Sequence, residues 1–449
     1  MLKESNEKKI VIASVPFVDT STPLPAPAAL KAAMLSQGLQ CVGLDLNIEI
    51  YNKIQHHPKR QWFLDFFYRQ IIREEIANEL NLMLDFYHRE IMMHNPDIVG
   101  LSLFSANSQV FTMWLCAMFR HRTPDVELII GGPGLQTLEN TLFKFPDRVK
   151  RLGLIDGFIT GDAEQSLVEY VRGNKDFPGI NSFDWRPVEN FEQSAIPNYA
   201  DYRLLKYVTP ELHIIDSRGC VQDCEFCDVI AFWEKFQYLS AETIFQHMLS
   251  HIDNYGVYRF QLGSSICNGN LREFKKLVNL IADYNQQVNP QEEIYWMGSF
   301  IIRSASQHPE SLWQAIKSSN GLLLTGVESI TEKIRMGLGK KFTNADLDHH
   351  LNMAKKYQVP IHLLMIAVYH GETDKDIENT KQWFIDRKEF VNNPVQQIQL
   401  TLLSVLPGTK LEKNINQGIT EKIKSNRSGK ASELLKVLIQ CGFNVRTFF

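Results

Sequence analysis

Short apolar runs alternate along the first part of the chain with longer stretches in which apolar residues recur every three or four positions. The short runs predict strands at residues 9–15, 40–45, 98–103, 126–130 and 157–159. Helical spacing is clearest in residues 27–37, in one long stretch over 62–93 and in residues 164–171. Because strands that alternate with helices form doubly wound parallel sheets, the pattern predicts an α/β, Rossmann-like first domain.

The pattern changes after this domain, where Pro178, Pro187 and Pro197 stand among Asn and Asp residues with little periodicity. A second alternating series follows, with predicted strands at residues 212–216, 259–262, 293–296, 322–326, 361–367 and 397–403. Predicted helices occupy residues 241–254, 271–285, 309–318, 344–357 and 374–386. Six such units predict a partial (β/α)6 barrel of the TIM type, whose loops after the strands carry the chemistry.

These patterns divide the chain into four parts. We expect the Rossmann-like domain at residues 1–173, a linker at 174–205, the partial barrel at 206–412 and a short helical C-terminal segment with an apolar end at 413–449.

Composition narrows the class of protein. The chain has 449 residues, 44% of them hydrophobic, which is enough for several buried cores. Its 47 Lys and Arg against 51 Asp and Glu give a formal net charge of −4 without blocks of like charge, so no nucleic-acid partner is expected. The apolar runs are far shorter than the roughly 20 residues of a membrane span, and residues 1–9 are too polar for a signal peptide. We therefore expect a cytoplasmic protein without a membrane partner.

Three of the seven cysteines form a local cluster. Cys220, Cys224 and Cys227 follow the pattern C-x3-C-x2-C on a Gly-containing loop directly after a predicted strand. A cluster of this kind indicates a metal or redox centre rather than a disulfide framework. Three thiolates satisfy three corners of a four-iron cluster and leave one iron open for a small molecule. The alternatives are a structural zinc site or three unrelated buried cysteines, but zinc calls for a fourth Cys or His close by, and His213 lies before the loop on a strand.

With Phe226 just before the third cysteine, the motif resembles the signature of the radical S-adenosylmethionine (SAM) enzymes. The resemblance implies a [4Fe–4S] cluster held by the three cysteines, with SAM chelated to the open iron and Phe226 as one of its contacts. It also implies radical chemistry on a small-molecule substrate and a one-electron reductant such as flavodoxin or ferredoxin.

Further segments resemble this family in the expected order. Residues 324–329 are similar to the segment after the fourth barrel strand, which implies that Glu328, beside Ser329, hydrogen-bonds the ribose hydroxyls of SAM. Gly371 and Glu372 after the fifth strand, and residues 406–409 after the sixth, match two further loops of the group, so Gly371 and Glu372 are also implied as SAM contacts.

Two loops are less clear. Ser264 and Ser265 lie in a turn after the second strand that resembles the one that meets the amino group of SAM, although Gly263 and Ser264 stand where relatives often carry acidic residues. Arg303, beyond the third strand, is implied as a partner of the SAM carboxylate, and a surface arginine is the alternative.

Residues 9–171 resemble the cobalamin-binding domains that precede many radical SAM enzymes. The resemblance implies cobalamin contacts at the strand ends, from Ser102, Leu103, Gly131, Gly132 and Gly161. The loop after the first strand, residues 16–21, lacks the histidine that ligates cobalt in many cobalamin proteins, so cobalamin is expected without a protein axial ligand. The alternative is a Rossmann-like domain that has lost its ligand or that docks substrate.

These resemblances predict a cobalamin-dependent radical SAM methyltransferase acting on an unactivated carbon of a small molecule or natural-product precursor. Two alternatives stay open: a cobalamin-independent radical SAM enzyme that abstracts hydrogen for rearrangement, cyclisation or oxidation, and a non-catalytic iron–sulfur protein. Of the remaining cysteines, Cys267 is interpreted as a small apolar filler, and Cys41, Cys116 and Cys441 are interpreted as core residues.

Overall fold

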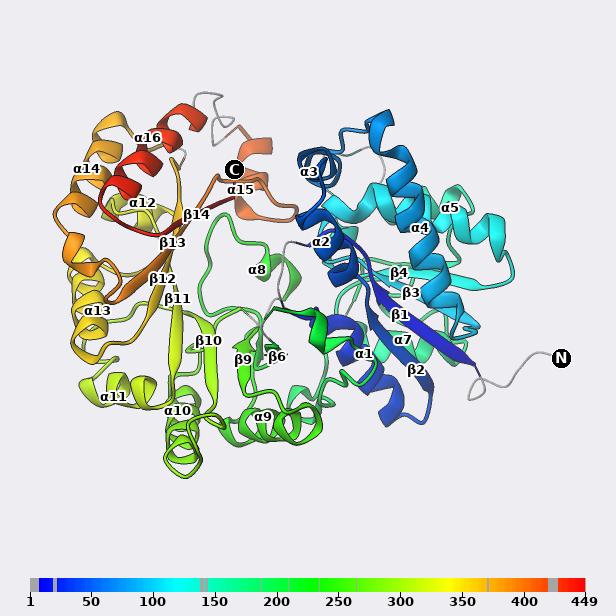
Figure 1. The fold of residues 1–449 in the computed structure, drawn as a ribbon, viewed down its shortest axis with the longest axis horizontal. Coiled ribbons are helices and arrows are strands. Elements are labelled where there is room, and N and C mark those ends of the chain that lie inside the picture. Colours follow the sequence, from blue (N-terminus) through cyan, green and yellow to red (C-terminus); the bar gives the residue numbers. More distant parts are fainter. Residues whose placement is uncertain are drawn as a thin grey trace. The chain divides into compact units, whose positions relative to one another are not determined.

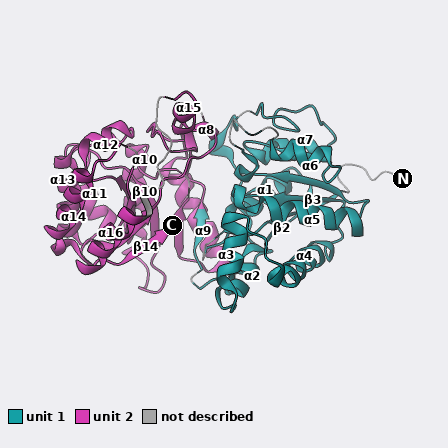
Figure 2. Ribbon diagram, turned by 90° about the horizontal axis from the view of Figure 1, so that it is seen from above, with its two compact units in different colours: residues 1–213 teal, residues 214–449 magenta. Residues whose placement is uncertain are grey.

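The computed structural model describes residues 8–18, 22–137, 141, 144–185, 187–208, 210–233, 235–263, 265–369, 371–418 and 427–448. The chain divides into two compact units, Met1–His213 (unit 1) and Ile214–Phe449 (unit 2), which Figure 2 colours separately. Ser264, named above as a SAM contact, lies outside the described residues.

Unit 1 is built on a five-stranded parallel sheet in the order β2-β1-β3-β4-β5 (Figure 1). Its strands are β1 (Lys9–Ser14), β2 (Gln40–Asp45), β3 (Ile98–Ser102), β4 (Glu127–Gly131) and β5 (Gly157–Ile159). The predicted doubly wound sheet is confirmed. Its strand order reverses between β1 and β3, and in such sheets ligands bind outside the carboxyl ends of the strands at that point.

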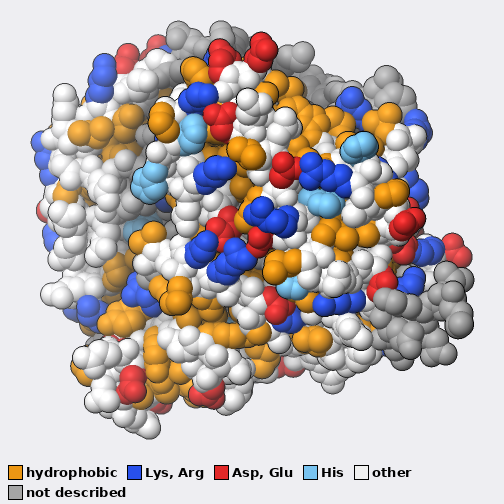
Figure 3. Space-filling model, turned by 45° about the vertical axis from the view of Figure 1, so that its right-hand side comes forward, with side chains coloured by type: hydrophobic (Ala, Val, Ile, Leu, Met, Phe, Trp, Pro, Cys, Tyr) orange, Lys and Arg blue, Asp and Glu red, His pale blue; other side chains and the backbone are white. Residues whose placement is uncertain are grey.

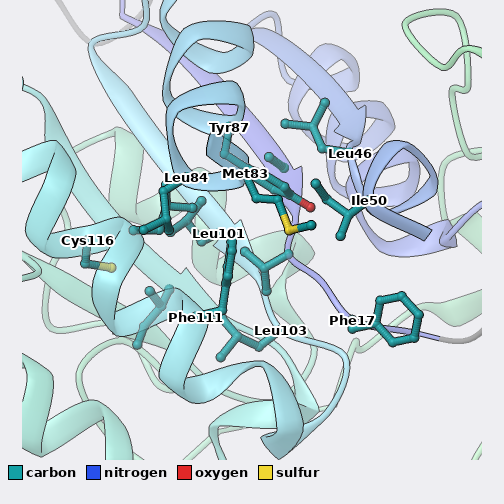
Figure 4. Close-up of a cluster of buried hydrophobic side chains, with 14 of the residues drawn as sticks. Phe17, Leu46, Ile50, Met83, Leu84, Tyr87, Leu101, Leu103, Phe111 and Cys116 are labelled. Atoms are coloured by element: carbon teal, nitrogen blue, oxygen red, sulfur yellow. The ribbon is translucent and has the colours of Figure 1, made fainter. Parts of the chain in front are cut away.

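The helices of unit 1 connect these strands and bury two faces of the sheet. They are α1 (Pro25–Ser36), α2 (Asn47–Gln55), α3 (Arg60–Arg69), α4 (Ala77–Met92), α5 (Gln109–Arg122), α6 (Phe145–Arg151) and α7 (Ala163–Val171). The larger core lies between the sheet and α3, α4 and α5. Figure 4 shows part of it, with Met83 and Tyr87 from α4, Leu101 from β3 and Phe111 and Cys116 from α5 in one cluster.

The single long helix predicted over residues 62–93 is wrong. Helix α3 ends at Arg69, Gln70 takes a left-handed φ of 56°, and α4 begins only at Ala77. Both helices bury their apolar faces in the same core, so the chain has to turn between them. Neither Gly nor Pro marks the break, so the periodicity alone did not reveal it.

The stretch that composition indicates as a linker folds against α1 and β2. The Tyr202 hydroxyl donates to the Leu24 carbonyl at 2.8 Å and accepts from the Ala28 amide at 3.1 Å. The Asp201 carboxylate pairs with Lys31 Nζ at 2.5 Å. Because these contacts join residues far apart in the sequence, this segment is part of unit 1 as far as His213.

Unit 2 is built on a seven-stranded sheet in the order β6-β9-β10-β11-β12-β13-β14, with parallel pairing from β9 to β14. Its strands are β6 (Leu212–Ile214), β9 (Arg259–Leu262), β10 (Tyr295–Phe300), β11 (Gly321–Glu328), β12 (Ile361–Ile366), β13 (Val395–Thr401) and β14 (Val445–Phe448). The six predicted barrel strands are confirmed. The expected helical tail is confirmed only in part, because its apolar end forms β14, which pairs with β13 and covers its outer edge.

The helices of unit 2 include α9 (Ala241–Tyr255), α10 (Leu271–Asn285), α11 (Glu310–Ser318), α12 (Glu332–Gly337), α13 (Asn344–Tyr357), α14 (Asp374–Ile385), α15 (Lys410–Asn416) and α16 (Arg427–Gln440). Helices α11, α13 and α14 lie along one face of the sheet (Figure 1). A short antiparallel pair, β7 (Ser217–Arg218) and β8 (Gln237–Tyr238), brackets the cysteine cluster and the short helix α8 (Val229–Phe232).

The lone cysteines follow the predictions with one exception. Cys267, Cys41 and Cys116 are buried, which confirms them as core residues. Cys441 is only half-buried, so its prediction is wrong. It follows the last turn of α16, where Leu438 and Phe443 take the core positions instead.

Candidate active site

The three clustered cysteines lie on the loop that leaves the carboxyl end of β6. Cys224 is buried, Cys220 and Cys227 are half-buried, and all three are free thiols. The Cys227 amide donates to the Cys224 carbonyl at 3.2 Å, so the last two cysteines share a tight turn. The pKa of Cys224 responds to charge on both other cysteines, so the three side chains lie within electrostatic reach of one another.

Burial has the largest influence on the pKa values of Cys224 and Cys227. It raises the pKa of Cys224 to about 12 and that of Cys227 to about 11, with further increases from neighbouring negative charge. Metal binding at this loop would therefore release protons. Within the described residues, no three Cys, His, Asp or Glu side chains stand in position to share one ion. A four-iron cluster places each thiolate on a different iron, so its ligands stand farther apart than those of a single ion.

Glu225 anchors the cysteine loop, a role that the sequence analysis missed. Its carboxylate accepts from the Tyr369 hydroxyl at 3.0 Å and from Asn414 Nδ2 at 3.1 Å. Its amide donates to the Leu338 carbonyl at 3.0 Å. The next residue, Phe226, packs against a small apolar cluster that contains Leu338 and Tyr369. A lone glutamate between two cysteines carries no spacing signal, so only the tertiary contacts identify it.

Glu328 ends β11 in an unusual conformation. Its φ is 65°, and the register with β12 shifts between Gly326 and Glu328. Few residues other than glycine adopt a positive φ, and the bulge turns this side chain from the line of the strand. The carboxylate is buried and pairs with Lys340 Nζ at 3.0 Å.

Arg303 lies in the loop after β10. Its Nη2 donates to the carbonyls of Asn268 and Gly269 at 3.2 and 3.3 Å. Its buried Nε has no hydrogen-bond partner among the described residues, and its charge interacts with that of Cys220. An unused N–H beside the cysteine loop fits a carboxylate ligand. Ser265, in the loop after β9, is half-buried.

Ser329 and Glu372 contact each other. The Ser329 hydroxyl donates to Glu372 Oε1 at 2.6 Å, and the Tyr369 amide donates to Glu372 Oε2 at 2.7 Å. Both carboxylate oxygens therefore hold the loop after β12, and both side chains line a small cavity with Val368. Gly371 makes the turn possible with a φ of 85°, in open space.

The residues named in unit 1 lie at the carboxyl edge of its sheet. Ser102 pairs with Gly131, and the Leu103 amide donates to the Gly131 carbonyl at 2.8 Å. Gly132 has a φ of 101°, and a Cβ there would stand 2.4 Å from the Leu103 oxygen, so only glycine fits. Phe104, which the sequence analysis missed, follows on this rigid loop with 55% of its surface exposed.

Gly161 stands apart from this group. Its φ is 71°, and the Trp185 ring occupies the space where a Cβ would project, with the nearest ring atom 2.0 Å away. Trp185 therefore covers the backbone of Gly161.

Charged side chains of both signs are mixed on the surface, as the near-neutral net charge predicts (Figure 3). Lys and Arg side chains lie among Asp and Glu on the face drawn in Figure 3. Within the part of the chain that the structure describes, no helix combines the length and the apolar character that a bilayer crossing needs.

Unit 2 is a partial β/α barrel whose cysteine loop follows the carboxyl end of its first strand. Residues 214–384 match the Radical SAM superfamily, so unit 2 carries a radical SAM domain. The domain implies a [4Fe–4S] cluster and SAM as cofactors, and the three buried or half-buried free thiols fit the cluster.

Two curated relatives extend the comparison. A protein of Methanocaldococcus jannaschii, provisionally named a methylthiotransferase, is 23% identical over 270 residues, which cover 57% of this chain and 57% of that protein. The hopanoid C-3 methylase of Methylococcus capsulatus is 23% identical over 333 residues, which cover 68% of this chain and 59% of that protein. The matches thus span less than two thirds of either relative.

Among solved structures, the chain resembles the radical SAM methyltransferase TsrM from Kitasatospora setae, solved with cobalamin and a [4Fe–4S] cluster bound. The TM-score is 0.67, and the match covers 92% of this chain and 75% of TsrM at 14% identity. At this identity the likeness shows the fold, and it extends over both units.

Proposed function

We propose that the chain is a cobalamin-dependent radical SAM methyltransferase that methylates an unactivated carbon of a small molecule. The main support for the proposal is that one chain contains two different sheets in a defined order. A 2-1-3-4-5 sheet with a glycine-lined carboxyl edge precedes the radical SAM domain. The hopanoid methylase and the cobalamin-bound TsrM support it by their names and by the shared fold.

The residues of unit 2 receive distinct roles in this proposal. Cys220, Cys224 and Cys227 would each hold one iron, Arg303 would bind the carboxylate of SAM, and Glu328 would accept from its ribose hydroxyls. When bound, the cluster and SAM supply a one-electron route to a carbon-centred radical, and cobalamin supplies a methyl carrier. The electron comes from a one-electron reductant, for which we propose a flavodoxin or a ferredoxin.

The other predicted SAM contacts of unit 2 have more limited roles in the proposal. Ser265 lies in the loop after β9, where we propose that it faces the amino group of SAM. Ser329, Gly371 and Glu372 shape the loop after β12 through their own hydrogen bonds and turn. In the proposal they support the SAM site by fixing this loop.

The carboxyl edge of unit 1 fits a large flat ligand. Gly131 and Gly132 bring the backbone to the surface, and Ser102 and Leu103 lie beside them. Phe104 offers an exposed ring on a loop that hydrogen bonds hold rigid. An exposed aromatic beside the point where the strand order reverses favours a ligand with an apolar face. At the end of β5, the Trp185 ring packs on Gly161.

The experiment is to purify the protein anaerobically from cobalamin-supplied cells and to measure bound corrinoid, iron and the products formed from SAM. We expect corrinoid, four irons per chain, and both 5′-deoxyadenosine, which takes the hydrogen from the substrate carbon, and S-adenosylhomocysteine, which is left when SAM methylates the carrier, together with a methylated product. Phe104→Ala should lower corrinoid retention. Leu152→Ala removes an equally exposed apolar side chain at the opposite, amino-terminal edge, just before β5, and should not.

Each other outcome contradicts a defined part of the proposal. A fully loaded cluster without corrinoid, with 5′-deoxyadenosine and no S-adenosylhomocysteine formed from SAM, would indicate hydrogen abstraction without cobalamin. A product that gains a methylthio group would indicate the reaction named for the archaeal relative. No cleavage of SAM by protein with a full cluster would indicate a non-catalytic iron–sulfur protein.

A further inference from the structure

Lys340 is a largely buried cation beside the cysteine loop, and nothing in the sequence motifs marks it. Only 13% of its side chain is exposed, and its ammonium pairs with Glu328 Oε1 at 3.0 Å. Burying a charge is costly unless other charges compensate it, so a lysine in this position calls for a negatively charged environment.

Two glycines allow Lys340 its position. The backbone of Gly339, with a φ of 89°, packs so closely on the cysteine loop that a Cβ would stand 2.6 Å from the Asp223 oxygen and 3.2 Å from the Cys224 Cα. A Cβ on Gly326 would stand 2.6 Å from both Glu328 Oε1 and Lys340 Nζ. The first glycine therefore fixes Lys340 to the cysteine loop, and the second leaves room for its ion pair.

The segment that carries Lys340 is attached to the cysteine loop. The Glu225 amide donates to the Leu338 carbonyl at 3.0 Å, two residues before Lys340, and Gly339 packs on Cys224. Burial would lower the pKa of Lys340 itself, but negative charge on Glu328 and Cys224 outweighs it and raises this pKa. The ammonium thus pairs with the Glu328 carboxylate and interacts electrostatically with Cys224.

We propose that Lys340 is the counter-ion of the iron–sulfur cluster and raises its reduction potential. The inference rests on the proposed cluster. Three thiolates and Glu328 bring negative charge to a buried site, and reduction adds one more. The potential of an iron–sulfur cluster depends on the net charge and hydrogen bonds around it, so a fixed ammonium favours the reduced form.

The test compares Lys340→Met with Lys341→Met in reconstituted protein without SAM. Lys341 is the neighbouring lysine and its side chain is exposed. Iron content and absorbance establish cluster loading, and a potentiometric titration followed by electron paramagnetic resonance measures the midpoint potential. We expect Lys340→Met to hold about tenfold less reduced cluster at a fixed solution potential, a shift of about 59 mV for one electron. Lys341→Met should match the wild type, and Lys340→Arg should stay close to it.

A fully loaded Lys340→Met cluster with the wild-type potential would overturn the inference. If Lys340→Met does not take up iron, Glu328→Gln provides the second test. It removes the neighbouring anion and leaves the ammonium, so it should raise the potential, and an unchanged potential would overturn the inference. Wild-type protein that binds no four-iron cluster would instead refute the proposed function.

Discussion

In each unit the candidate site lies at the carboxyl edge of that unit's own parallel sheet, but the two sites consist of different chemical groups. In unit 2, ionisable side chains form the site: three cysteines, Arg303 and the Glu328–Lys340 pair. In unit 1, the backbone forms it, with Gly131 and Gly132 packed against the Leu103 loop and one exposed aromatic, Phe104. A small charged ligand needs placed charges, whereas a large flat ligand needs close approach of the backbone. In the proposed function, the carboxyl edge of a parallel sheet thus serves two kinds of ligand.

The largest expected effect breaks the side-chain site of unit 2. Cys224→Ala should abolish the four-iron absorbance and all cleavage of SAM, because it removes one of the three proposed protein ligands. Iron analysis and the visible spectrum of reconstituted protein measure this. Cys267→Ala is the matched control, since Cys267 is a buried cysteine with 1% exposure after β9, and it should keep the cluster. A four-iron signal retained in Cys224→Ala would refute the ligand assignment.

The next effect breaks the backbone site of unit 1. Gly132→Ala should destabilise unit 1 by about 3 kcal/mol and lower corrinoid retention, because its Cβ would collide with the Leu103 oxygen. Gly173→Ala is the control, since Gly173 has a similar φ of 92° but open space around its Cβ position. It should cost only the backbone strain, about 1 kcal/mol. Thermal and denaturant unfolding of both variants give the comparison, and equal losses would show that close approach is unimportant here.

The smallest expected effect concerns the pKa of a buried histidine in unit 2, the unit whose site consists of ionisable side chains. His308 of unit 2 is buried against Phe300 and Trp313, and Asn268 Nδ2 lies 3.4 Å from its Nε2. Burial first, then the charge of Arg303, lowers its pKa from 6.5 to about 3. Between these two pH values, His308 is protonated in the unfolded chain and neutral in the folded chain. The free energy of unfolding therefore falls as the pH drops from 6.5 toward 3.

His308→Gln should remove this part of the acid sensitivity, worth about 2 kcal/mol at pH 5 relative to neutral pH. Urea unfolding at pH 5 and pH 7.5 measures it. His121→Gln, a change at an exposed histidine of α5, should leave the pH dependence as in the wild type. An unchanged pH dependence in His308→Gln would contradict the assigned pKa.

Much of the fold was predictable because periodicity reports burial. The predicted bounds of β2, β5, β9, α10 and α13 agree with the structure, since each element has one clearly apolar face or is buried throughout. Prediction failed where a distant part of the chain decided the outcome. The break after Arg69 depends on a core shared by α3 and α4, and β14 forms because β13 offers it an edge.

Some features of the candidate sites were likewise predictable from the sequence, and others depended on tertiary contacts. The sequence by itself determined the cysteine spacing, the glycine at the end of β4 and the order of the loops, because local spacing and strand order are properties of the chain. Only the tertiary structure decided that Glu225 anchors the cysteine loop, that Trp185 covers Gly161 and that Lys340 lies beside Cys224. These contacts join residues that lie far apart in the chain. Whether a side chain is buried beside a charge depends on what packs around it, and that is settled only when the sheets and helices assemble.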